Sequence, residues 1–213
     1  MTKERPILFS GPMVRAILAG TKTQTRRVLK QATGPSLSVD CSDNGVAELS
    51  WLWGDGPGYD VNETIKHVPC PYGQPGDRLW VRECWARDDE DGALMYRADL
   101  GLGGSADDWE RNRLDGVPRF RWRPSIHMPR WASRITLGVA GVRVERLQGI
   151  SKTDALAEGI VQLKDGGYGL PAGEHYHSAD PRQSYLSLWE AINGPGSVEA
   201  NPWVWCVEFA RTA

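Results

Sequence analysis

Three short segments in which apolar and polar residues alternate constrain the fold of this chain more than any other feature. They span residues 78–83, 135–144 and 203–209. A period of two residues is typical of β-strands with one buried face. In the second segment the alternation changes phase next to Gly141, which predicts a β-bulge or a barrel corner. The chain is therefore expected to be rich in short strands.

Short helices are predicted between these strands. Ser10 can cap a helix that Gly20 ends, and Ser151 with Asp154 forms a capping box for a second helix. Pro181 opens a third. The sequence has neither an internal repeat nor the alternation of strand and helix that predicts a parallel sheet. We therefore expect an α+β fold, namely a small, mostly antiparallel β-barrel with flanking short helices and long loop insertions.

A single domain over residues 1–213 is expected from the length of the chain. Stretches rich in glycine, proline and polar residues are interpreted as insertions, at about 34–75, 86–128 and 161–180. The first is interpreted as irregular, with a small hairpin around Gly54-Asp55-Gly56. The second contains one predicted strand, at residues 93–96.

Composition excludes several classes of protein. The net charge of −2 shows that the chain is not a polycation, so a nucleic-acid surface must be a local patch. The 10 tryptophans exceed ordinary usage, and some can stack on bases. The four cysteines lack zinc-like spacing, and no third ligand accompanies His175 and His177, so we expect neither a metal site nor another cofactor. Without a leader or a membrane-spanning run, a cytoplasmic protein with reduced thiols is expected.

A cationic, hydroxyl-rich segment, Gly20-Thr21-Lys22-Thr23-Gln24-Thr25-Arg26-Arg27, follows the first predicted helix as a loop. Lys22 can lose its proton when it is desolvated, and Arg26 or Arg27 can bind a carbonyl or phosphate group. The same side chains can instead bond to local backbone groups and complement the C-terminal end of the helix. Composition does not separate a ligand-binding role from this structural one.

Two glutamates are also candidates for a functional site. Glu158 lies in the last turn of the second predicted helix, where the helix dipole opposes a negative charge. An exposed glutamate is the simpler interpretation unless the fold brings Glu158 beside Lys22. Glu83 ends the strand at 78–83 next to Arg82, and an ordinary salt bridge is sufficient to explain it.

A basic stretch at residues 119–134 interleaves five arginines with aromatic residues, as surfaces that hold phosphates and stack bases do. The alternative is a solvated charged ribbon that balances the acidic insertion before it. We favour nucleic-acid binding because the aromatic residues are interleaved with the arginines. The candidate residues are Arg119, Arg121, Trp122, Arg123 and Arg130.

On these motifs the chain resembles the ASCH domain family, a branch of the PUA-like barrels. The matching motifs are Gly20-x-Lys22-Thr23-x-Thr25-x-Arg27 and Pro75-Gly76-Asp77-Arg78-Leu79-x-Val81-Arg82-Glu83. The strands at 135–146 and 203–209 and the helix from Ile150 to Gly159 also fit. The match covers the framework and not the insertions. The chain looks especially like the larger ASCH proteins of phage and prophage genomes, some of which are labelled morphogenetic.

The resemblance implies a cleft that binds RNA or a nucleobase beside the 20–27 segment. Small bacterial members of the family are amidohydrolases that remove the acyl group from N4-acetylcytidine, another member is a ribonuclease, and others only bind RNA. Their catalytic lysine, threonine and glutamate correspond to Lys22, Thr25 and Glu158. Substrate-binding residues are then expected to be Gly20, Thr23, Arg26, Arg27 and Glu83.

The resulting hypothesis is recognition of RNA or a modified nucleoside, with hydrolysis of an N4-acylated cytidine or of RNA. The alternative is a non-catalytic protein that binds RNA or acts in phage morphogenesis or regulation. This chain is longer than the small hydrolases, so its insertions can cover or reshape the cleft.

Overall fold

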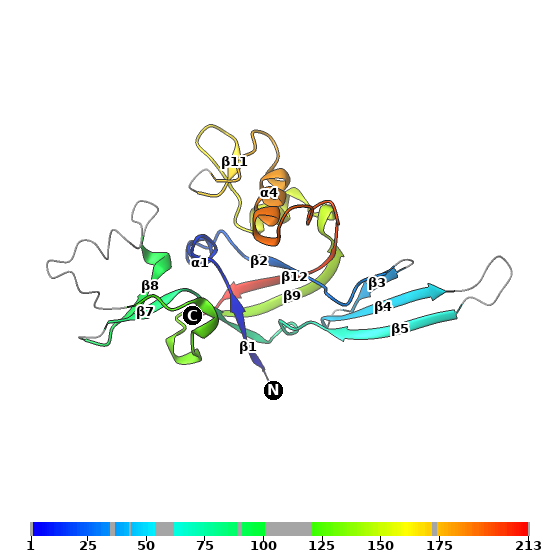
Figure 1. Ribbon diagram of the computed structural model, residues 1–213, viewed down its shortest axis with the longest axis horizontal. Helices are drawn as coiled ribbons and strands as arrows, with labels where there is room; N and C mark the ends of the chain where they lie inside the picture. The colour runs from blue at the N-terminus through cyan, green and yellow to red at the C-terminus, as the bar shows by residue number, and fades with distance from the viewer. Residues whose placement is uncertain are drawn as a thin grey trace.

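A five-stranded sheet forms the centre of the molecule in the computed structural model (Figure 1). The structure describes residues 2–34, 37–42, 44–53, 62–88, 91–100, 121–171 and 174–212. The strands, in spatial order, are β1 (Glu4–Leu8), β6 (Arg78–Arg82), β9 (Thr136–Arg146), β12 (Trp203–Arg211) and β2 (Gln24–Val28). The β1–β6 pair is parallel and the other pairs are antiparallel.

The sheet is open. Within the described residues β1 and β2 are its two edges and do not pair with each other. The expected α+β class with mostly antiparallel strands is confirmed, and the closed barrel is not found. Strand β2 contradicts the sequence interpretation, because most of it lies in the 20–27 segment, which was predicted to be a loop. Its polar sequence does not have the alternation typical of a strand. Backbone hydrogen bonds to β12 and ion pairs of its buried side chains hold it in the sheet.

The bulge predicted next to Gly141 is confirmed. In the pairing of β9 with β12, Glu208 lies opposite Gly141 and Phe209 lies opposite Val139, so Ala140 is the extra residue. The bulge restores the alternation of buried residues on both sides of the phase change.

Three smaller sheets surround the central one. The stretch at 34–75, interpreted as irregular, is instead a three-stranded antiparallel sheet in which Trp51 pairs with both Leu37 and Thr64. Its many serine, aspartate and glycine residues dilute the alternation, and Gly54–Gly56, the expected hairpin turn, lie outside the described residues. The predicted strand near 93–96 is confirmed. The strands of the smaller sheets are β3 (Leu37–Cys41), β4 (Val46–Trp53), β5 (Asn62–Pro69), β7 (Trp85–Arg87), β8 (Leu94–Tyr96), β10 (Val161–Gln162) and β11 (Tyr168–Gly169).

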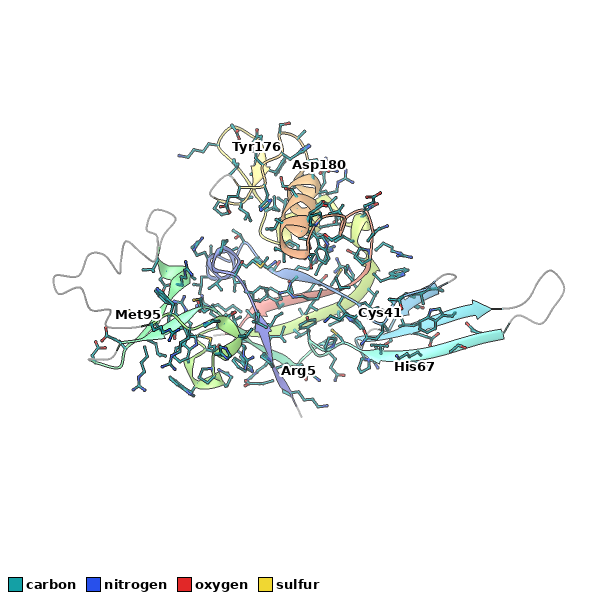
Figure 2. All side chains as sticks on the ribbon, in the orientation of Figure 1. Arg5, Cys41, His67, Met95, Tyr176 and Asp180 are labelled. Carbon is teal, nitrogen blue, oxygen red and sulfur yellow. The ribbon has the colours of Figure 1, made fainter. Side chains whose placement is uncertain are left out.

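The β3–β4–β5 sheet and the β7–β8 hairpin extend from opposite ends of the central sheet (Figure 1). Cys41 and His67 lie at the end of the three-stranded sheet nearest the centre (Figure 2). The outer part of β5 is exposed, including half of the Ile65 side chain. The inner part of the three-stranded sheet packs on the centre, because Ala47, Leu49 and Val68 share one hydrophobic core with β12.

The predicted helices all form. Ser10 occupies the N-cap position of the first helix, but its side chain makes no capping hydrogen bond. The Ser151 hydroxyl accepts a hydrogen bond from the Asp154 amide at 3.1 Å, and Asp180 caps the longest helix. None of the described helices is long and apolar enough to cross a membrane. The α-helices are α1 (Gly11–Leu18), α3 (Lys152–Ala157) and α4 (Pro181–Asn193), and short 3-10 segments are η1 (Arg97–Asp99), η2 (Ser125–His127), η3 (Arg130–Ala132) and η4 (Leu147–Gly149).

Strand β12 separates two hydrophobic cores. Its residues Trp205, Val207 and Phe209 pack into the core that contains α1, and Val204 and Cys206 pack into the core under α3 and α4. Alternate residues of one strand can serve two cores because successive side chains point to opposite faces. The neighbouring edge strand β2 lies where the two cores meet, and this junction holds the candidate site.

Candidate functional site

The turn after helix α1 fixes the start of the candidate site. Gly20 has a φ of +76°, a left-handed conformation that glycine adopts without strain. The amides of Thr21 and Lys22 then both donate to the Ala16 carbonyl, at 2.9 and 3.1 Å. The chain reverses, and Lys22 forms a β-bridge with Glu158 at the end of α3.

Lys22 and Glu158 form a buried ion pair. The Lys22 Nζ lies 2.6 Å from Glu158 Oε2 and 2.8 Å from the Glu158 carbonyl oxygen. The exposed fractions of the two side chains are 0% and 3%. Burial lowers the pKa of Lys22 from its ordinary value, and the Glu158 carboxylate opposes part of that shift. The fold therefore brings Glu158 beside Lys22, which was the condition for a functional role of Glu158.

Arg26 holds the second oxygen of the same carboxylate. Its Nη1 lies 3.3 Å from Glu158 Oε1, and its Nη2 contacts Glu145 and lies 3.3 Å from Asp154 Oδ2. Arg143 closes this network through Glu145 and Asp154. Because cations hold both oxygens of Glu158, the carboxylate has a fixed orientation.

Thr25 is fully buried beneath Arg27. Its hydroxyl oxygen accepts a hydrogen bond from Arg27 Nη1 at 2.8 Å, and Arg27 Nη2 donates to the Leu8 carbonyl at 2.9 Å. Gly20 and Thr23, which were also expected to bind substrate, are exposed and do not line the cavity described next.

A cavity of about 380 Å³ opens over this group, within the size range of small-molecule sites. Glu158, Arg26 and Arg27 provide its charged groups, whereas Lys22 and Thr25 lie behind them and do not line it. Its remaining lining residues, mostly apolar or aromatic, are Leu8, Phe9, Ser10, Met13, Val28, Ser125, Tyr185, Leu188, Trp189, Ile192 and Asn193.

Glu83 lies outside this group. Its carboxylate accepts hydrogen bonds from Arg134 Nε at 2.9 Å and Nη2 at 3.1 Å, and it does not line the cavity. Burial raises the pKa of Glu83, and Arg134 partly offsets that shift. This pair explains the burial of Glu83 without a ligand, so its assignment to substrate binding remains a sequence prediction that the geometry does not favour.

The basic stretch is largely engaged within the protein. Arg130 Nε lies 3.0 Å from Glu4 Oε2, and the Arg123 guanidinium stacks over the Trp85 ring at 5.0 Å. Arg121 is exposed and Trp122 is half-buried. Arg119 lies outside the described residues. Arg121, Arg123 and Arg130 are all exposed, so the geometry does not decide whether this stretch binds a phosphate backbone.

Sequence reasoning missed several residues of the site. Glu145, Asp154, Tyr185 and Trp189 were not among the candidate site residues. Glu145 and Arg143 alternate with Val142 and Val144 in β9, so they occupy ordinary polar positions of a strand and do not signal an ion pair with Arg26. Phe9 gave no signal either, because an aromatic residue after a strand is ordinary.

The described residues contain no group of three or more histidine, cysteine, aspartate or glutamate side chains arranged to hold a metal ion. Comparisons of the chain with protein-family models, with curated proteins and with solved structures found no match. The functional argument therefore rests on the geometry of the cavity and on the chemistry of its walls.

Proposed function

We propose that this chain is an ASCH domain of the PUA-like superfamily that binds a modified nucleobase in the cavity and hydrolyses its acyl-amide bond. The observation that carries the proposal is the buried Lys22–Glu158 pair, with Glu158 at the wall of a cavity of about 380 Å³. In this proposal the open five-stranded sheet corresponds to the wall of a PUA-like barrel, and the insertions prevent the barrel from closing.

The walls of the cavity suit a flat heteroaromatic ligand. Phe9, Tyr185 and Trp189 are each at most 5% exposed and provide ring surfaces. Arg26 and Glu158 provide a donor and an acceptor for the polar edge of a base. Stacking with a few polar groups that fix orientation is the usual way in which proteins bind single bases.

In this proposal Glu158 carries the proton transfer, because it is the carboxylate among the lining residues of the cavity. In the proposed reaction it accepts a proton from a water molecule as the water oxygen attacks the acyl carbon. It then delivers this proton to the leaving exocyclic nitrogen, so that the products are a carboxylic acid and the free amine. Lys22 and Arg26 hold the carboxylate in position throughout.

Attack by the Thr25 hydroxyl, with Lys22 as its base, is the other route that the ASCH resemblance suggests. Arg27 now donates to that hydroxyl and covers it, so this route requires the Arg27 side chain to move. Attack by water requires no such movement, and the geometry favours it.

The test is an assay of acetate release from N4-acetylcytidine by the wild-type protein and by Glu158→Gln. We expect a rate loss of at least about 100-fold in the variant, the lower range for removal of a general acid–base group. Glu199→Gln is the matched control, because Glu199 is exposed and does not line the cavity, and it should retain the wild-type rate.

Thr25→Val separates the two routes. It should retain activity if water attacks and lose activity if Thr25 attacks. Binding of cytidine with no release of acetate by a folded wild-type protein would leave only non-catalytic recognition. Full activity in Glu158→Gln would refute the site.

A further inference from the structure

Arg27 is the cation of the candidate site that has no carboxylate partner in the described part of the chain. Lys22 pairs with Glu158, and Arg26 pairs with three carboxylates. The acceptors of Arg27 are neutral: the Thr25 hydroxyl and the backbone carbonyl oxygens of Arg26 and Leu8. Its positive charge is therefore uncompensated at the wall of the cavity.

The groups around Arg27 are hydrogen-bond donors without acceptors. The side chains of Ser10 and Ser125 line the same cavity, and neither hydroxyl has a hydrogen bond among the described residues. Trp189, which is 5% exposed, lines it as well, and its buried Nε1–H has no acceptor there. Ser10 is exposed and Ser125 is half-buried, so their hydroxyls are open to a ligand. The Trp189 N–H is buried, and because buried donors are normally satisfied it points to an acceptor on that ligand.

Arg27 lies close to the proposed reacting group without bonding to it. The Arg27 guanidinium lies 5.4 Å from the Phe9 ring centroid, and Lys22 Nζ, the partner of Glu158, lies 5.8 Å from the same centroid. The hydrogen bonds of Arg27 go to Thr25 and Leu8 and not to Glu158. A ligand with its base near Glu158 can therefore extend an anionic group to Arg27.

We propose that the ligand of this cavity carries a phosphate bound by Arg27 and the hydroxyls of Ser10 and Ser125, so that the substrate class is a nucleoside monophosphate. This proposal rests on the proposed function for the identity of the base. A guanidinium fork with hydroxyl donors is the usual recognition group for phosphate. Arg130 and Arg134 of the 119–134 stretch are already paired with carboxylates, which leaves fewer cations for a polyanion and favours a mononucleotide over RNA.

The experiment compares binding of cytidine 5′-monophosphate, cytidine, inorganic phosphate and a ten-nucleotide oligocytidylate by calorimetry. We expect wild-type protein to bind the monophosphate about 10- to 100-fold more tightly than cytidine, as charge-assisted hydrogen bonds allow. Arg27→Gln should reduce this preference to less than about threefold. Arg211→Gln, at an exposed strand end, should keep the wild-type preference.

Ser125→Ala provides a second test in case the Arg27 variant does not fold, because Arg27 also donates a hydrogen bond to the Leu8 carbonyl. It should reduce the preference for the monophosphate over cytidine about fivefold, as expected for the loss of one hydrogen bond.

Equal affinity for cytidine and its monophosphate would overturn the phosphate site, even if N4-acetylcytidine is hydrolysed. Binding of inorganic phosphate that depends on Arg27, without binding of cytidine, would support the phosphate site and overturn the nucleobase function. Tight binding of the oligonucleotide alone would overturn the assignment to mononucleotides.

Discussion

Replacing Lys22 with methionine tests whether the buried pair with Glu158 stabilises the fold as well as the site. The substitution keeps the length of the side chain and leaves the Glu158 carboxylate, 3% exposed, without its partner at 2.6 Å. Loss of one member of a buried pair costs about 3–5 kcal/mol. Because Arg26 still lies 3.3 Å from the other oxygen, we expect the lower end, about 3 kcal/mol. For a chain of 213 residues this corresponds to a Tm lower by about 6–12 °C.

The assay is urea unfolding followed by tryptophan fluorescence at pH 7, with the double variant Lys22→Met/Glu158→Gln. Removing both charges should recover at least about 1 kcal/mol relative to the sum of the single variants, because the uncompensated charge is gone. Lys66→Met, at an exposed position of β5, should change the free energy of unfolding by less than about 0.5 kcal/mol. A loss below about 1 kcal/mol for Lys22→Met, or additive single effects, would refute the reasoning.

Three further predictions concern other parts of the fold. Gly159→Ala should lower the free energy of unfolding in urea by about 1–3 kcal/mol, because Gly159 has a φ of +99° and an added Cβ would lie 3.3 Å from a methyl group of α1. Gly149→Ala is the control and should leave the free energy of unfolding unchanged. A hydrogen bond from Arg182 lowers the pKa of Asp180 to about 2. The folded state thus binds this proton more weakly than the unfolded state. In urea unfolding, wild type should therefore be more stable than Asp180→Asn above pH 4, and this difference should shrink as the pH is lowered toward 2. Burial raises the pKa of Cys70 to about 11, so mass spectrometry should show native Cys70 and Cys206 alkylated far more slowly than the two half-buried cysteines.

Much of the framework could be predicted because its signals are local. The strands at 78–82 and 203–211 follow from period-two alternation, and the caps of α3 and α4 follow from Ser151 and Asp180. Even the bulge in β9 is visible as a change of phase at Gly141. These features depend on residues within one or two turns of each other, where propensity and hydrogen-bonding chemistry act directly.

The errors concern segments whose structure is decided by partners far away in the chain. Strand β2 is polar and reads as a loop, but its pairing with β12 buries Arg26 among carboxylates. Arg134, at the end of the basic stretch, likewise depends on distant partners, because it pairs with Glu83 and Asp99, which are 51 and 35 residues away in sequence. Local sequence does not encode such pairs, because they depend on strand order and register.

The sequence by itself determined the alternating strands, the capped helices and the two residue types, lysine and glutamate, that a Lys22–Glu158 site requires. Only the tertiary structure decided that these residues, 136 positions apart, lie in contact, and that Arg27 keeps a charge that no described carboxylate neutralises. The physical reason is that strands and caps arise from short-range backbone and side-chain preferences. A buried ion pair arises only when the packed sheet excludes water from charges brought together by the fold.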